Sequence, residues 1–447
     1  MGGHRRSGDA PEAALLRSAA ARHRASPKGF RGVRAAGRSR PRAARPGPRR
    51  PPNNEVMMGP TPLCIGAVVP RTGRLSRLGD PLAFVIDRSA AGQASVRGAD
   101  GRLRPLRFAV RDSRSDPAHA REAVRGLVAE DGADIVVAMA GTRVLPAVVG
   151  TCEELRVPCL STTFPWQAFA RGRAAAADGP FPWSHHFAWG LDDIAEVFAE
   201  MWGLLGPGRT VGCLWNDDLQ GRLLREVFAP TARERGHTLV DPGGYAEPAT
   251  DLSAHVDRIL RGGADVVTSA ATADDLALFI AQARAAGLRP RLLTCSRWLA
   301  YPHTHAGAEL SRARVATLVY WTPRHPFRSS LDGTTAAELA TAYEAATGTP
   351  WLQPLGLACA LVEVAHHALA SAEDPGDRAS VAAALSRTRL ATMAGTLDFT
   401  RGPAPGIARV PLAGGQWHPT RDGHALEVVT NTAVPEVAVT ADLAPAT

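Results

Sequence analysis

The sequence predicts an α/β protein with two similar lobes, each built on a mainly parallel sheet. Short apolar runs rich in β-branched residues alternate with segments of helical periodicity, which is the pattern of strands joined by right-handed helical crossovers. The order of these elements starts again near Thr210, and one short sequence signature occurs in each half. We therefore expect two lobes of the same class over residues 61–430.

The first lobe begins with an apolar run over Leu63–Val69, which predicts a buried parallel strand ending before Pro70. A helix start follows later in this half, because Asp116 occupies the position of an N-cap and Pro117 that of the first helical residue. The other strands expected in this half are Leu106–Val110, Ile135–Met139 and Val157–Leu160.

The second half repeats this order and then departs from it. Its expected elements are strand Val211–Trp215, helices Leu219–Arg235 and Leu252–Leu260, strand Val266–Ser269, helix Ala273–Ala286 and strand Arg291–Thr294. Two longer helices are predicted at Thr334–Ala346 and Leu355–Ala370, and a late pair of strands at Thr396–Phe399 and Ile407–Leu412.

The repeated signature supports the relation between the lobes. It reads Gly132-Ala133-Asp134-Ile135-Val136-Val137 in the first half and Gly263-Ala264-Asp265-Val266-Val267-Thr268 in the second. In both copies a helix ends at glycine, a short turn carries aspartate, and an apolar strand follows. The shared signature and the shared order of elements together indicate an internal duplication.

The positive charge of the chain is confined to its N-terminal segment. Residues 1–56 contain 14 Lys and Arg against 3 Asp and Glu. Of the 51 basic and 43 acidic residues in the whole chain, 37 basic and 40 acidic residues therefore lie after residue 56. A nucleic-acid-binding surface needs a basic patch on the folded part of a protein. The slightly acidic remainder therefore argues against a nucleic-acid partner.

Both ends of the chain are expected to lack a packed structure. Residues 1–60 form an Arg/Pro-rich segment that buries too little apolar surface to order, and residues 431–447 are expected to be loose. Three interpretations of the first segment stay open: translation that starts at Met57 or Met58, an unusual targeting segment, or a basic arm. Arg5-Arg6 is followed by no apolar run of about 7–15 residues, so no signal peptide is visible, and no run of about 18 apolar residues predicts a membrane span.

No motif for covalent chemistry is present. Gly206-Pro207-Gly208 precedes a strand, whereas a dinucleotide-binding loop follows one, and neither a P-loop nor a G-x-S-x-G elbow occurs. The six cysteines form no C-x-x-C pair and lie in or beside apolar runs, which predicts buried thiols, with a Cys152–Cys159 disulfide as the alternative. His303 and His305 lack further ligands at metal-binding spacing. We expect no enzyme activity, no cofactor and no metal.

Binding residues are instead expected where the strands end. In an open α/β sheet, ligands bind beyond the carboxyl ends of the strands. These ends carry hydroxyls and glycines, namely Thr72, Gly141, Thr142, Ser161, Thr162, Thr163 and Thr272. Such groups, with backbone donors near helix N-termini, suit a carboxylate or another polar head, although each Ser or Thr alone is also typical of ordinary helix capping.

At these residues the chain resembles the type I periplasmic solute-binding proteins, the leucine/isoleucine/valine-binding branch that serves ABC importers. The matching motifs are Ile65–Gly73, Arg111–Ala123, Val157–Thr162, Asn216–Gly221 and Gly395–Phe399, and the resemblance covers residues 61–420. It implies two Rossmann-like lobes joined by three crossings that act as a hinge. Lobe 1 would comprise residues 61–187 and 323–391, and lobe 2 residues 188–322 and 392–430.

The resemblance also implies a function. A small polar solute, such as an amino acid, amide or related acid, would bind in the cleft between the lobes for delivery to an ABC permease outside the cytoplasm. With no visible signal peptide, an intracellular ligand sensor on the same fold stays the alternative. By position in the family, Thr142 and Ser161 to Thr163 would contact the ligand in lobe 1, and Gln220 and Thr272 in lobe 2.

Two departures from the family pattern bear on the ligand. Phe187-Ala188-Trp189 replaces a Phe-Arg-Thr entry to lobe 2, and Arg297 lies where amino-acid binders often carry an acid. Trp189 and Trp321 lie near the expected crossings, so with Arg297 they favour an anion or polar solute with a flat or apolar body. We expect branched-chain amino acids to bind more weakly than an aromatic or amide-type acid. Asp217, Asp218 and Asp274 remain candidates for an acid that could pair with an ammonium.

Overall fold

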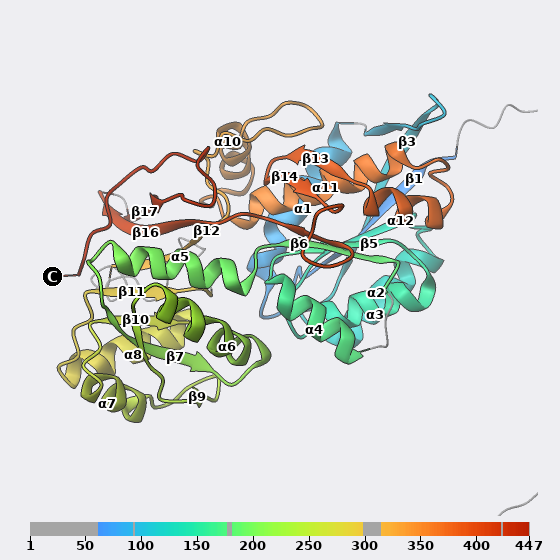
Figure 1. Cartoon of the computed structure of the whole chain (residues 1–447). Coiled ribbons are helices and arrows are strands. Elements are labelled where there is room, and N and C mark those ends of the chain that lie inside the picture. The colour runs from blue at the N-terminus through green and yellow to red at the C-terminus, as the bar shows by residue number, and fades with distance from the viewer. Residues whose placement is uncertain (1–60, 93, 177–180, 298–313, 422, 447) are drawn as a thin grey trace, which may run out of the picture. The chain divides into compact units, whose positions relative to one another are not determined.

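The computed structural model describes residues 61–446 except 93, 177–180, 298–313 and 422 (Figure 1). The N-terminal segment 1–60, His303 and His305 lie outside the described residues. Within the described part of the chain, two large sheets carry the fold, and a two-stranded hairpin accompanies them. The predicted class, an α/β protein with two lobes, is confirmed.

The first sheet has seven strands in the order β15-β6-β5-β4-β1-β3-β2. All neighbours are parallel except β2 and β3, which pair antiparallel. The strands are β1 (Leu63–Val69), β2 (Ser95–Arg97), β3 (Leu103–Asp112), β4 (Ile135–Met139), β5 (Cys159–Thr162), β6 (Ser184–Ala188) and β15 (Ile407–Arg409). The helices of this lobe are α1 (Ser76–Ala91), α2 (Pro117–Ala129), α3 (Leu145–Leu155), α4 (Trp166–Ala176), α10 (Ala336–Thr347), α11 (Pro354–Ser371) and α12 (Arg378–Ser386).

The second sheet has the order β17-β16-β12-β11-β10-β7-β8, and β9 pairs with β7 beside this path. Its central strands are parallel, and the hairpin β16–β17 adds antiparallel strands at the β12 edge. The strands are β7 (Thr210–Asn216), β8 (Thr238–Val240), β9 (Gly244–Tyr245), β10 (Val266–Ser269), β11 (Leu292–Cys295), β12 (Val315–Val319), β16 (Ala413–Thr420) and β17 (Gly423–Thr430). The helices are α5 (Leu191–Gly203), α6 (Leu219–Glu234), α7 (Ser253–Arg261) and α8 (Ala273–Ala285).

The repeated signature has the same structural role in both lobes. Asp134 accepts a hydrogen bond from the Cys64 backbone N–H at 2.8 Å, and its own N–H donates to the Cys64 carbonyl at 3.0 Å. Asp265 makes the equivalent pair with Thr210, at 3.2 Å and 3.0 Å. The preceding glycines have φ of 58° and 69°, a left-handed conformation that favours glycine. Each aspartate thus fixes the start of one central strand to its neighbour.

The predicted boundary between the lobes in the C-terminal region is wrong. Residues 392–430 were expected in lobe 2, but β15 pairs parallel with β6 in the first sheet. The strands predicted as a late pair do not pair with each other either, because β14 (Gly395–Asp398) pairs with β13 (Arg389–Thr392). Only β16 and β17 of this region enter the second sheet. Local sequence pattern identifies a strand but not its partner.

The C-terminal segment 431–446 is packed rather than loose. Val434 and Val437 are buried, in a cluster with residues of β16 and β17. The Gln416 carboxamide accepts from the Ala444 N–H and donates to the Ala444 carbonyl, both at 2.8 Å. The last described residue, Ala446, donates to the Arg291 carbonyl at 2.8 Å. These bonds fasten the segment along the second sheet, a correction to the expectation.

Burial explains the apolar composition of α11 and the state of the cysteines. Among the described helices, α11 has the length and apolar composition to cross a membrane, but 78% of it is buried inside the protein. Its apolar surface therefore covers α1, α12 and the first sheet. All six cysteines are buried and none forms a disulfide, as expected for core thiols.

Candidate ligand-binding cleft

A cleft lies where the two lobes face each other and encloses about 750 Å³ when its open mouth is included. Its lining comes from the carboxyl ends of strands in both sheets, as the fold class predicts. The first lobe contributes Arg74, Leu75, Leu78, Ala140, Gly141, Thr142, Thr163, Phe164 and Pro165. The second lobe contributes Gln220, Ser296 and Arg297, and the crossings contribute Trp189 and Tyr320.

The first-lobe wall is formed by the residues after β4 and β5. The Gly141 carbonyl accepts hydrogen bonds from the Val144 and Leu145 N–H groups, both at 3.0 Å, which turns the chain into α3 beside Thr142. Thr163 has a φ of 97°, a strained conformation for a β-branched residue, and its hydroxyl donates to the Ala140 carbonyl at 3.3 Å. Strain of this kind costs roughly 1–3 kcal/mol and is concentrated at functional sites.

A stacked aromatic pair forms the wall at the crossings. The rings of Trp189, which follows β6, and Tyr320, which follows β12, lie 4.4 Å apart with an angle of 20° between their planes. The Tyr320 N–H donates to the carboxamide oxygen of Gln353 at 3.0 Å, which fixes the backbone behind the ring. Both residues line the cleft, so the pair contributes a mainly apolar aromatic surface to it.

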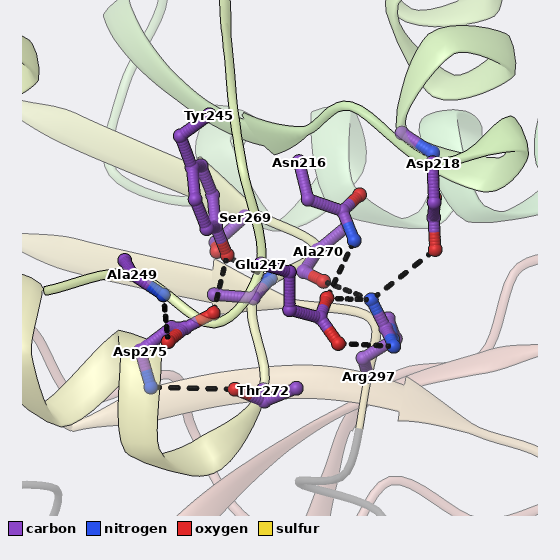
Figure 2. A network of polar contacts seen from close by, with 12 residues as sticks. Asn216, Asp218, Tyr245, Glu247, Ala249, Ser269, Ala270, Thr272, Asp275 and Arg297 are labelled. Carbon is purple, nitrogen blue, oxygen red and sulfur yellow. Dashed lines mark hydrogen bonds and ion pairs between the residues drawn. The ribbon is translucent and has the colours of Figure 1, made fainter.

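A network of polar contacts supports the second-lobe wall (Figure 2). The Arg297 guanidinium makes a two-point ion pair with Glu247, with Nη1–Oε2 at 2.6 Å and Nη2–Oε1 at 3.2 Å. Asp218 lies 3.5 Å from Nη1, and Asn216 donates from Nδ2 to Glu247 Oε2 at 2.7 Å. The Arg297 side chain is 14% exposed. This arginine is therefore held in one orientation before a ligand arrives.

A second group of contacts holds the loop that carries Glu247. The Tyr245 hydroxyl donates to Asp275 Oδ2 at 3.3 Å, and the Ala249 N–H donates to Oδ1 at 2.9 Å. Asp275 is itself fixed at the start of α8, where its N–H donates to the Thr272 hydroxyl at 3.3 Å (Figure 2). Burial, and then the Asp275 charge, raise the pKa of Tyr245, so its hydroxyl stays a donor. The loop is thus bonded on both sides of Glu247.

Six of the residues predicted from the sequence line the cleft: Gly141, Thr142, Thr163, Trp189, Gln220 and Arg297. Arg297 differs from the expectation in one respect. It was expected to offer its charge to an anion, but Glu247 and Asp218 already neutralise that charge. Asp218 also caps α6 by accepting from the Gly221 N–H at 2.8 Å, whereas Asp274 lies in the first turn of α8.

The other five predicted residues do not line the cleft, and this is a correction. Thr72 donates its hydroxyl to Asp112 at 2.7 Å, and Thr272 is the N-cap of α8. Ser161 is fully buried, with its hydroxyl 3.0 Å from His186 Nδ1 on the neighbouring strand β6. Thr162 is also fully buried and donates to the Phe187 carbonyl at 2.7 Å, and Trp321 packs against Trp351 instead.

Sequence reasoning missed several residues of the site. Phe164 and Pro165 directly follow the predicted Ser161–Thr163 segment, so a search of immediate neighbours would have found them. Glu247 gave no such signal, because it lies 50 residues before Arg297 in a loop without a recognisable motif. In the part of the chain that the structure describes, no group of His, Cys, Asp and Glu is arranged to hold a metal ion.

The chain has two lobes of Rossmann-like topology, and its cleft is lined by the carboxyl ends of strands and by the crossings. This architecture is that of a binding protein that holds its ligand between two lobes. The family model for periplasmic binding proteins matches residues 62–417, and the chain belongs to this family. The resemblance inferred from the sequence motifs is thereby confirmed. No protein of curated function matches the sequence.

Solved structures of similar fold include three bacterial binding proteins. The leucine-binding protein of Thermotoga maritima is 16% identical, with a TM-score of 0.65 over 83% of this chain and 99% of that chain. A solute-binding protein of an ABC transporter from Rhodopseudomonas palustris, in complex with 4-hydroxybenzoate, is 14% identical, with a TM-score of 0.65 over 83% and 96%. An extracellular ligand-binding receptor from R. palustris HaA2 is 21% identical, with a TM-score of 0.63 over 82% and 99%. At these identities the likeness establishes the fold alone.

Proposed function

We propose that this chain binds a small polar solute in the cleft, without converting it, and delivers the solute to an ABC permease outside the cytoplasm. The observation that carries the proposal is the composition of the cleft. The cleft combines the aromatic pair of Trp189 and Tyr320 with a first-lobe wall that carries the hydroxyls of Thr142 and Thr163 and a second-lobe wall that carries a fixed arginine. Such a lining suits a ligand with an apolar body and polar ends.

The ligand that fits best is an aromatic or amide-type monocarboxylate. Its carboxylate would occupy the first-lobe wall at Thr142 and Thr163, near the start of α3, where the helix dipole favours negative charge. Its flat body would lie against the stacked pair. Two solute-binding proteins of similar fold were solved with 4-hydroxybenzoate and with 3,4-dihydroxybenzoic acid, which supports this class of ligand. Leucine, isoleucine and valine should bind more weakly, because they lack a flat ring for the stack.

A thermal-shift screen tests the binding proposal. The panel should hold aromatic monocarboxylates, amides, amino acids and small peptides. A ligand at about 100 times its dissociation constant should stabilise the chain by about 2.7 kcal/mol. Trp189→Ala should lower the affinity for the best ligand at least tenfold, whereas Trp351→Ala, which removes a ring outside the cleft, should not. Tight binding of a branched-chain amino acid with no effect of Trp189→Ala would contradict the proposal.

Transport needs a separate experiment. A strain that lacks this chain should take up the radiolabelled ligand more slowly than its parent, and the chain supplied in trans should restore the rate. Unchanged uptake would refute delivery to an importer but would leave solute binding intact.

A further inference from the structure

The charge of Arg297 is compensated before any ligand enters the cleft. Its guanidinium pairs with Glu247 at 2.6 Å and 3.2 Å, and Asp218 lies 3.5 Å from the same Nη1. One cation and two carboxylates give this group of three a net charge of −1. The second-lobe wall therefore differs from the positive wall that Arg297 alone would form.

The arrangement of these three charges disfavours a charged group on the ligand. A second carboxylate of a ligand would approach Arg297 with the like charges of Glu247 and Asp218 directly behind it. An ammonium would meet the guanidinium itself, because Arg297 lines the cleft and the two acids do not. A neutral acceptor is free of both repulsions, and a guanidinium can only donate hydrogen bonds.

Ser296 provides a second, independent observation at the same wall. Ser296 lines the cleft, and its hydroxyl is buried and has no hydrogen-bond partner among the described residues. Buried polar atoms are nearly always hydrogen-bonded, so an unpartnered hydroxyl in a binding cleft is a place for a ligand group. A hydroxyl both donates and accepts, so Ser296 can bond to a neutral hydroxyl, carbonyl or carboxamide, and the adjacent charges of Glu247 and Asp218 argue against a carboxylate at the same place.

We propose that the second-lobe wall selects a solute whose second polar group is uncharged, and that Glu247 is the positioning residue that enforces this selection through Arg297. The ligand class is then a flat monocarboxylate with a hydroxyl, carbonyl or carboxamide at its other end. This inference rests on the proposed function. Glu247 acts by orienting the guanidinium and by neutralising it, so that Arg297 serves as a hydrogen-bond donor rather than as a counter-ion.

Isothermal titration calorimetry with two probes of the same ring tests the inference. The probes are 4-hydroxybenzoate, with a neutral para group, and terephthalate, with a second carboxylate. Wild-type protein should bind 4-hydroxybenzoate at least tenfold more tightly. Glu247→Gln keeps the shape and removes the charge, so it should reduce this preference at least tenfold by improving terephthalate binding.

The matched control is Glu196→Gln. Glu196 also pairs with an arginine of lobe 2, Arg235 at 2.6 Å, but lies outside the cleft. This variant should keep the wild-type preference. A thermal midpoint for Glu247→Gln near that of the control shows that the fold is retained.

The outcomes separate the inference from the proposed function. An equal loss of affinity for both probes in Glu247→Gln, or an unchanged preference between them, would overturn the role of Glu247. Tighter binding of terephthalate than of 4-hydroxybenzoate by wild-type protein would overturn the selection of an uncharged group. Binding of another member of the screen but of neither probe overturns the inference and leaves the proposed function intact. If no compound of the screen binds, both the inference and the proposed function are overturned.

Discussion

Gln353 connects the first lobe to the crossing that carries Tyr320, so its removal should weaken both the fold and the site. The residue is the N-cap of α11, and its side chain is fully buried. Its Oε1 accepts from the Tyr320 N–H at 3.0 Å and from the Trp321 N–H at 3.4 Å, and its Nε2 donates to the Leu318 carbonyl at 3.3 Å. Gln353→Ala leaves three backbone groups of this crossing without these partners.

The expected loss follows from these three bonds. A buried backbone group without a partner costs roughly 1–3 kcal/mol, and two of the three bonds are long, so Gln353→Ala should reduce the free energy of unfolding by about 2–4 kcal/mol. Urea denaturation at neutral pH measures this change. Tyr320 also loses its backbone support, so the affinity for the cleft ligand should fall in the same variant.

Gln282→Ala is the control for this prediction. Gln282 also accepts from a backbone N–H, that of Leu252 at 2.7 Å, but its side chain is partly exposed. Water can replace the lost bond there, so we expect a loss below about 1 kcal/mol. If Gln353→Ala were no more destabilising than Gln282→Ala, the crossing would not depend on this carboxamide, and the reasoning would be wrong.

Three further predictions concern packing, protonation and thiol access. A Cβ at Gly356 would come within 2.2 Å of the buried Trp321 ring, so Gly356→Ala should lower the unfolding free energy by about 1–3 kcal/mol in urea denaturation. Gly150→Ala on α3 is the control, because a Cβ there meets nothing within 4 Å and should not lower the unfolding free energy. Burial lowers the pKa of His186 from 6.5 to about 3, so as the pH falls the unfolded chain takes up this proton first and stability is lost between these values. His186→Gln should therefore remove about 2 kcal/mol of the stability difference between pH 7 and pH 5, and an unchanged difference would contradict a neutral buried imidazole. Burial raises the pKa of Cys64 and of Cys295 to about 11, so a thiol reagent should label all six cysteines in urea and none in the folded protein, and rapid labelling of the folded chain would count against the packing.

Local signals in the sequence were sufficient for much of the secondary structure. The strands β1, β4 and β10 have the predicted bounds, because each is a buried apolar run between clear turn residues. Asp116 caps α2 as expected, accepting from the Ala118 and His119 N–H groups at 2.8 Å and 3.0 Å. These features depend on residues within a few positions of one another, so the sequence by itself determined them.

The duplicated lobes were likewise readable from the chain. The glycine before each aspartate of the repeated signature adopts positive φ, and Asp134 and Asp265 bond to the first residues of a neighbouring strand. Equal spacing of turn, acid and strand in two places was therefore enough to indicate two equivalent lobes. The membership in a binding-protein family followed from the order of such motifs.

The tertiary structure alone decided which of the polar residues face the cleft. Ser161, Thr162 and Thr163 are consecutive residues at one strand end. Ser161 and Thr162 lie within β5 and pair with β6, whereas Thr163 turns away from the strand with a positive φ and is the one of the three that lines the cleft. The partner of β15 and the packing of residues 431–446 were decided in the same way. Glu247 reaches Arg297 across 50 residues of chain because β7, β10 and β11 bring their ends together. Hydrogen bonding between distant segments has no periodicity along the sequence, so the charge of the cleft wall could be known only from the fold.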